Sequence, residues 1–222
     1  MPNRKIVSIE GNIGSGKSTL RELLEKSSFP IGNSPSYILV YVDEPVNEWE
    51  TIVDSKGVNI IEKFYSDQKE YSFAFQMMAY ISRLASLKRA IELHNQDKDV
   101  IFVCERSLWT DRYVFAQMLH DEGKIENIKF QIYLKWFDEF IKDYPLDAII
   151  YVTTEPELCS GRITKRNRQG ETIPLEYLHR CHEYHTRWLK TNLDCELLEV
   201  NPNFDSTIKY FIYDFLHKIW ES

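Results

Sequence analysis

Residues 6–19 read Ile6-Val7-Ser8-Ile9-Glu10-Gly11-Asn12-Ile13-Gly14-Ser15-Gly16-Lys17-Ser18-Thr19 and carry the clearest indication of the fold class. Its second part fits the pattern G-x-x-x-x-G-K-[ST], in which glycines let consecutive backbone N–H groups curl around phosphates. A strand-like run precedes the pattern and a helical segment, Lys17–Lys26, follows it. A glycine-rich turn that binds nothing is the alternative, but this context favours a phosphate-binding loop.

Each residue type in this loop suits a nucleoside triphosphate. The N-terminus of the following helix adds partial positive charge, Lys17 can reach the β- and γ-phosphates, and the Ser18 hydroxyl can ligate Mg²⁺. We therefore expect the donor nucleotide, with Mg²⁺, to bind Gly11, Asn12, Ile13, Gly14, Ser15, Gly16, Lys17, Ser18 and Thr19. The loop alone does not identify the acceptor of a phosphoryl group.

The rest of the chain predicts an α/β fold. Five short apolar runs are typical of buried strands, and longer segments with helical spacing separate them: Lys5–Glu10, Tyr37–Asp43, Val100–Glu105, Ala148–Thr153 and Glu196–Val200. This alternation predicts a doubly wound parallel sheet with helices on both faces. No repeat or linker divides the sequence, so residues 1–222 are expected to form a single domain. We expect a surface connection at Ser27–Ser36 and a mobile basic loop at Arg162–Thr172.

Composition excludes several classes of function. The 222 residues carry a net charge of −7, which argues against a general nucleic-acid-binding surface. No apolar run approaches the roughly 20 residues that a membrane-spanning helix needs. Four scattered cysteines without metal-binding spacing are typical of reduced intracellular thiols. No signal or transit segment precedes the first strand, so we expect a cytoplasmic protein, or a mitochondrial one only if a transit peptide was removed.

Charged residues end two of the expected strands, where ligands bind in sheets of this kind. Asp43 and Glu44 precede Pro45, and a carboxylate there can accept the proton of an attacking hydroxyl; position alone does not separate the two, and a solvated acidic turn is the alternative. Glu105 could hold Mg²⁺ directly or through water, and Arg106 could stabilise charge on the transferred phosphoryl group. A mutual Glu–Arg ion pair is the alternative for these two residues.

A long helix expected at Tyr71–Asn95 carries Gln76, Ala79 and Arg83 on one stripe. The Gln amide complements the edge of a nucleobase, Ala79 leaves room beside it, and Phe75 and Phe115 can provide flat apolar walls. The alternative is an amphipathic helix with an ordinary polar face.

A basic cluster stands out in this acidic protein: Arg162, Lys165, Arg166 and Arg168 lie within seven residues. Like charges four residues apart repel each other, and a bound polyphosphate would relieve that repulsion. The cluster therefore favours a lid over the phosphate-binding loop, with a solvated charge cluster as the alternative.

Taken together, the segments GNIGSGKST, DEPVNEW, FAFQxxAYxSR, CERSLWTDRYVFA and IPLEY resemble the deoxynucleoside kinase family, the deoxycytidine and deoxyguanosine kinases especially. They follow in the expected order from residue 6 to about residue 204, which is nearly the whole chain. The resemblance implies transfer of the ATP γ-phosphate to the 5′-hydroxyl of a deoxyribonucleoside with Mg²⁺, in nucleotide salvage. It also implies a P-loop NTPase-type five-stranded parallel sheet, an arginine-rich lid at about 158–172, and a homodimer formed through helices, to which Phe130–Ile141 could contribute.

The resemblance also assigns roles to residues. Glu44 would be the catalytic base, assisted by Lys17 and Arg106, and Glu105 would serve Mg²⁺. The nucleoside would contact Glu44, Trp49, Tyr65, Phe75, Gln76, Ala79, Arg83, Arg106, Asp111, Phe115, Glu171 and Tyr177. The donor would contact Arg162, Arg166, Arg168, Asn203 and Phe204 as well as the loop. The segment Arg168–Ile173 is one residue shorter than the family pattern, and this departure bears on Glu171.

The pair Arg83 and Asp111 predicts the preferred base. A carboxylate can accept a hydrogen bond from the exocyclic amino group of cytosine or adenine, whereas thymine offers it a carbonyl oxygen and a methyl group. Thymidine-accepting members of the family carry smaller or apolar residues at these two positions. The sequence therefore predicts deoxycytidine and purine deoxynucleosides as substrates, with thymidine poor.

Two other functions fit parts of the sequence. A nucleoside monophosphate kinase such as thymidylate kinase shares the fold and the loop, but Glu44 beside the acceptor disfavours a charged acceptor phosphate. A non-catalytic, kinase-like assembly subunit would not need Lys17, Ser18, Glu44 and Glu105 to be intact.

Overall fold

A computed structural model describes residues 3–27, 36–96, 99–168, 170–191 and 193–222. Five strands form one sheet in the order β2-β3-β1-β4-β5, and every neighbouring pair is parallel. The strands are β1 (Asn3–Glu10), β2 (Ile38–Val42), β3 (Asp99–Glu105), β4 (Ala148–Val152) and β5 (Glu196–Val200). The predicted α/β class and parallel sheet are confirmed, and each predicted strand bound lies within two residues of the observed one. Most of the surface connection expected at Ser27–Ser36 lies outside the described residues.

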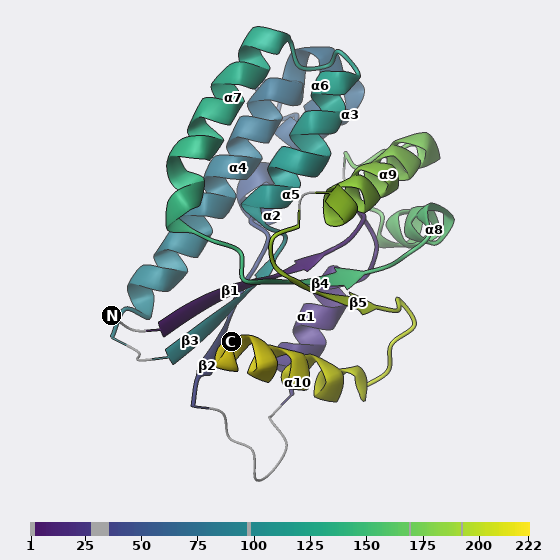
Figure 1. Cartoon of the computed structure of the whole chain (residues 1–222). Coiled ribbons are helices and arrows are strands. Elements are labelled where there is room, and N and C mark those ends of the chain that lie inside the picture. Colours follow the sequence, from purple (N-terminus) through teal and green to yellow (C-terminus); the bar gives the residue numbers. More distant parts are fainter. Residues whose placement is uncertain (1–2, 28–35, 97–98, 169, 192) are drawn as a thin grey trace.

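Helices cover both faces of the sheet (Figure 1). On one face, α1 (Lys17–Glu25) and α10 (Ile208–Glu221) bury Leu20, Leu24, Ile212 and Leu216 against the strands. The opposite face carries α4 (Gln68–Leu93), whose Leu87 packs on β3 and on Ile6 of β1. The sheet is therefore buried on both sides, as the continuous apolar runs of its central strands require.

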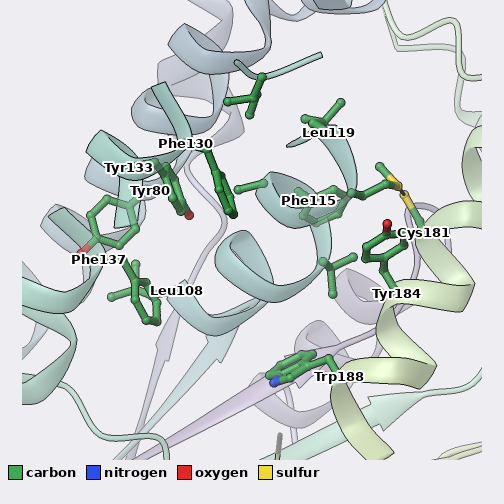
Figure 2. Close-up of a cluster of buried hydrophobic side chains, with 14 of the residues drawn as sticks. Tyr80, Leu108, Phe115, Leu119, Phe130, Tyr133, Phe137, Cys181, Tyr184 and Trp188 are labelled. Atoms are coloured by element: carbon green, nitrogen blue, oxygen red, sulfur yellow. Dashed lines mark hydrogen bonds between the residues drawn. The ribbon is translucent and has the colours of Figure 1, made fainter. Parts of the chain in front are cut away.

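A second apolar cluster lies above the sheet, between the helices on the α4 side. Figure 2 shows Tyr80 of α4, Tyr133 and Phe137 of α7 (Asn127–Phe140), Phe115, and Trp188 of α9 (Leu175–Thr191) within this cluster. Phe115 belongs to a π-helical turn, η1 (Asp111–Ala116). Such turns are rare and occur often at functional sites. The aromatic packing around Phe115 holds this turn in place, and with it Asp111, the first residue of the turn.

The remaining helices are α2 (Val46–Glu50), α3 (Ile60–Ser66), α5 (Leu108–Thr110), α6 (Gln117–Asp121), α8 (Pro156–Arg166) and a 3₁₀ turn, η2 (Ile141–Asp143). The prediction of a mobile loop beginning at Arg162 is wrong up to Arg166, because these residues continue α8. Pro156 is suited to the first turn of that helix, Cys159 and Ile163 anchor it in a buried cluster, and Asn167 ends it with a left-handed φ of 50°. The loop prediction overlooked Ile163, which is buried among the charged residues of 162–166.

The helix predicted at Tyr71–Asn95 begins three residues earlier, at Gln68, because the Asp67 side chain accepts a hydrogen bond from the Glu70 backbone N–H (3.1 Å). In the part of the chain that the structure describes, no helix is long and apolar enough to cross a membrane.

The carboxyl ends of β1 and β3 lie side by side. Ile9 pairs with Glu105 in the parallel register, and the Arg106 N–H donates to the Ile9 carbonyl at 3.0 Å. The loop after β1 and the charged residues after β3 are thereby brought to the same edge of the sheet, as expected for this fold class.

Candidate active site

The loop between β1 and α1 has the shape that its glycines allow. A Cβ at Gly11 would lie 2.7 Å from the Val152 carbonyl oxygen, so no larger residue fits there without a shift. The Asn12 side chain donates to the Leu178 carbonyl at 2.8 Å, which ties the loop to α9. Lys17 is buried, and its Nζ donates to the Asn12 carbonyl at 2.8 Å. Burial, assisted by the charge of Arg106, lowers the pKa of Lys17 to about 8.

A cavity of about 660 Å³ opens beside this loop, a size typical of small-molecule sites. The cavity is lined by most of the residues that were predicted from the sequence to form the site: Ile13, Gly14, Gly16, Lys17, Ser18, Thr19, Glu44, Trp49, Tyr65, Phe75, Gln76, Ala79, Arg83, Glu105, Arg106, Asp111, Phe115, Arg162, Arg166, Arg168, Glu171, Tyr177 and Phe204. Gly11, Asn12, Ser15 and Asn203 do not line it. The lining residues come from the segments that follow β1, β2, β3 and β5 and from several helices that are far apart in the sequence.

The structure distinguishes the two carboxylates at the end of β2. The Asp43 side chain is 69% exposed and pairs with Arg21, whereas that of Glu44 is 19% exposed. Glu44 Oε1 lies 3.1 Å from Arg83 Nη2 and 3.3 Å from Arg106 Nε. Burial alone would raise the pKa of Glu44, but the positive charges of Arg83, Arg106 and Lys17 outweigh it and lower that pKa to about 2. The Glu44 carboxylate is therefore ionised at neutral pH.

Glu105 and Arg106 do not form the mutual ion pair considered as an alternative. Glu105 Oε1 accepts a hydrogen bond from the Ser18 hydroxyl at 2.7 Å. Arg106 adopts a positive φ of 65°, donates to the Gly11 carbonyl at 3.0 Å and packs over the Phe115 ring at 4.9 Å. A non-glycine residue with positive φ is uncommon and worth noting at a functional site.

The Ser18 and Glu105 oxygens are hard donors of the kind Mg²⁺ prefers, and they meet at the end of the cavity beside the loop. Among the residues the structure describes, no three His, Cys, Asp or Glu side chains cluster as a metal site. The Ser18 and Glu105 oxygens by themselves fit Mg²⁺, which proteins usually bind through one or two carboxylates together with substrate phosphates.

Arg83 and Asp111 form a buried pair on the floor of the cavity. Arg83 is 6% exposed and Asp111 1% exposed, and the guanidinium contacts the carboxylate twice, at 2.9 and 3.2 Å. Gln76 and Ala79 of the same helical stripe are also buried. The stripe is thus buried, unlike the ordinary polar face of an amphipathic helix that was considered as an alternative. Burial raises the pKa of the Asp111 carboxyl, and the contact with Arg83 opposes that effect.

Aromatic rings form one wall of the cavity. Phe75 stacks on Phe64 with ring centroids 4.5 Å apart, and Trp49 meets Phe75 edge-on at 5.6 Å. Tyr65 and Tyr177 lie edge to face at 6.2 Å. Sequence reasoning missed Phe64, although the adjacent pair Phe64-Tyr65 in a short amphipathic helix is a signal that could have indicated it.

The lid arginines contact both the loop and Glu171. Arg162 donates to the carbonyls of Ser15 (2.6 Å) and Pro202 (3.3 Å). Arg166 Nη2 lies 2.5 Å from Glu171 Oε2, and Arg168 Nη1 lies 3.8 Å from the other oxygen. Glu171 also lines the cavity, although it lies within the segment Arg168–Ile173 that is one residue shorter than the family pattern.

The sequence model of the deoxynucleoside kinase family matches residues 7–213. The chain belongs to the deoxynucleoside kinase family. The match spans all five strands apart from the first residues of β1, so the family's P-loop fold and the observed sheet agree. The prediction of an ATP-dependent deoxynucleoside kinase is thereby confirmed.

Individual members of this kinase family are similar over nearly their whole length. A probable deoxycytidine kinase of fowlpox virus is 34% identical, with 99% of this chain and 92% of the relative covered. The deoxycytidine kinase of Homo sapiens is 34% identical over 93% of this chain and 86% of the relative. The mitochondrial deoxyguanosine kinase of Xenopus laevis is 30% identical, covering 91% and 83%.

Proposed function

We propose that this deoxynucleoside kinase phosphorylates deoxycytidine and purine deoxynucleosides in preference to thymidine, as part of nucleotide salvage. The observation that carries the proposal is the buried Arg83–Asp111 pair beside Gln76 and Ala79. A carboxylate on the pocket floor complements an exocyclic amino group and leaves the carbonyl oxygen of thymine facing another acceptor. Relatives named as deoxycytidine and deoxyguanosine kinases support the same preference.

Glu44 is proposed to act as general base on the 5′-hydroxyl. It is ionised, lies on the cavity wall, and is held by two guanidinium groups, so its oxygen is positioned before the acceptor binds. Arg106 would stabilise negative charge on the phosphoryl group during its transfer, and Arg106 would remain in contact with Glu44.

The donor ATP is proposed to bind the loop with its β- and γ-phosphates near Lys17 and the N-terminus of α1. Ser18 and Glu105 would hold Mg²⁺, which supplies a positive charge between the phosphates of the donor. Arg162, Arg166 and Arg168 would approach the phosphates from the lid, about residues 158–172. Phe204 lines the same cavity and, with Asn203, would contact the adenine.

The nucleoside is proposed to lie with its base between Phe75 and Phe115 and its edge toward Gln76. Trp49 closes this part of the cavity, and its indole N–H is fixed by Ser82 at 2.8 Å. Tyr65, Tyr177 and Glu171 are proposed to surround the sugar, with Tyr65 and Glu171 on the 3′-hydroxyl.

The protein is proposed to act as a homodimer of single-domain chains, spanning residues 1–222, in the cytoplasm. Helix α7 leaves Ile128, Ile132 and Trp136 exposed at intervals of four residues, which places them on one face. Ile81 of α4 is exposed as well, and α4 and α7 run side by side (Figure 1). Apolar positions repeated along one helical face favour association with a second copy.

A substrate panel tests the function. The purified protein is assayed with each of the four deoxynucleosides and the ribonucleosides as acceptor, and with ATP or UTP as donor, at saturating Mg²⁺. We expect kcat/KM to be highest for deoxycytidine or a purine deoxynucleoside with ATP. A preference for thymidine would contradict the proposed selectivity, and turnover of nucleoside monophosphates alone would contradict the proposed acceptor.

A further inference from the structure

The guanidinium of Arg83 contacts three separate parts of the site. Nε and Nη2 hold the Asp111 carboxylate, Nη2 also lies 3.1 Å from Glu44 Oε1, and Nη1 donates to the backbone carbonyl of Glu105 at 3.3 Å. The Trp49 ring packs 5.8 Å from the guanidinium carbon. One buried side chain thus joins the pocket floor to the carboxylate at the end of β2.

We infer that Arg83 positions the proposed general base Glu44 in addition to contacting the nucleobase, so that base recognition and proton transfer depend on the same guanidinium. This inference rests on the function proposed above and deepens it. It assigns Arg83 an effect on the chemical step that base recognition alone would not produce.

The geometry leaves Arg83 little freedom. Its planar group makes a two-point contact with Asp111, which fixes both the position and the orientation of the plane. The hydrogen directed at Glu44 is therefore fixed as well. Other charges that face Glu44 are Arg106, at 3.3 Å, and Lys17 and Asp111 farther off. Arg106 holds the same carboxylate oxygen, so two guanidinium groups contact one atom of Glu44.

This arrangement has a consequence for poor substrates. A base that fits the floor leaves Arg83 on Asp111 and Glu44, whereas a thymine methyl group in the space of Arg83 would displace the guanidinium. Glu44 would then lose one of its two close cationic partners. A mismatched base is therefore expected to lower kcat and not only to raise KM, because displacement of Arg83 also disturbs Glu44, the proposed proton acceptor.

A double-mutant cycle tests the coupling. Wild type, Arg83→Met, Glu44→Gln and the double variant are compared by kcat and KM with deoxycytidine at saturating ATP. If Arg83 acts through Glu44, Arg83→Met should lower kcat about tenfold or more in wild type and by less than about threefold in the Glu44→Gln background, because residues in contact are not additive. An Arg83→Lys variant, which keeps the charge but not the fork, should restore KM more than kcat.

Gln76→Leu combined with Glu44→Gln provides the matched control. Gln76 shares the helical stripe of Arg83 and lines the same cavity, but no contact joins it to Glu44 among the described residues. That cycle should be additive. Circular dichroism and ATP binding verify folding, and the main cycle is repeated in an Asp111→Asn background if Arg83→Met does not fold.

Additive losses in the Arg83 cycle would overturn the inference, because Arg83 would then serve the base alone. Such a result would leave the proposed function intact as long as wild type phosphorylates deoxynucleosides and Glu44→Gln is impaired. An inactive wild type, or a fully active Glu44→Gln variant, would instead overturn the proposed function or its general base. The two failures are therefore distinguishable.

Discussion

The double change Arg83→Met with Asp111→Ala is expected to raise the use of thymidine relative to deoxycytidine. In the wild-type site the Asp111 carboxylate would face the thymine carbonyl oxygen, and Arg83 occupies the space that the thymine methyl group needs. Removing both side chains removes the acceptor–acceptor conflict and opens the floor. Changing both together also avoids leaving one charged partner buried without the other, which typically costs about 3–5 kcal/mol.

The magnitude follows from the burial of the pair. Both side chains are more than nine-tenths buried, so a polar mismatch there has little access to compensating water. Such a mismatch costs about 1–3 kcal/mol, or roughly tenfold to a hundredfold in selectivity. We expect the thymidine-to-deoxycytidine ratio of kcat/KM to rise by that factor. Overall rates should fall with both substrates, because Arg83 also contacts Glu44.

The assay is competition of the two nucleosides for limiting ATP, with products separated by chromatography, so that the ratio of kcat/KM is measured directly. Each single variant serves as a control for loss of folding, which thermal unfolding monitors. A wild type that prefers thymidine would refute the reasoning. An unchanged ratio in a folded, active double variant would do the same.

Four further outcomes are expected. Glu44→Gln should lower kcat by roughly 10²–10⁴ with ATP binding retained, and a kcat within about threefold of wild type would rule out the general base. Arg166→Ala should lower kcat more than it raises the nucleoside KM; the reverse would place the lid at the acceptor. Because burial lowers the pKa of Lys17 to about 8, Lys17 is charged below that pH and loses its charge above it. ATP affinity, measured calorimetrically, should therefore fall between pH 7 and pH 9, and a constant affinity would count against this role. Trp136→Asp on α7 should convert a dimer to monomer in analytical ultracentrifugation, whereas an unchanged dimer would place the interface elsewhere.

The fold could be predicted because its signals are local. Each strand is a short apolar run, the loop pattern fixes the junction of β1 and α1, and alternation leaves few topologies for a parallel sheet. Helix α8 was the exception. Its outer face carries enough charge to suggest a loop. Its buried residues are Pro156, Cys159 and Ile163, a pattern too sparse to detect without the neighbouring helix.

The candidate site was predicted less completely, because burial is a property of tertiary packing. The helical spacing of Gln76, Ala79 and Arg83 identified a shared stripe, but an exposed and a buried stripe have the same spacing. The choice between Asp43 and Glu44 likewise depends on Arg21, which holds Asp43 toward solvent, and on Arg83, which holds Glu44 inward. No short-range pattern contains these pairings, since the partners are up to 39 residues apart.

The net charge of the sequence likewise gives no information about a local anion site. The chain carries a charge of −7, yet it gathers Lys17, Arg162, Arg166 and Arg168 in a single cavity. Two of these cations, Arg166 and Arg168, contact Glu171, and Arg162 donates to backbone carbonyls. A polyphosphate would therefore have to compete with Glu171 for the lid. Glu171, which is proposed to bind the sugar, contacts Arg166 and Arg168, which are proposed to bind the donor phosphates. Binding of either substrate should therefore change the charge that these side chains present to the other substrate.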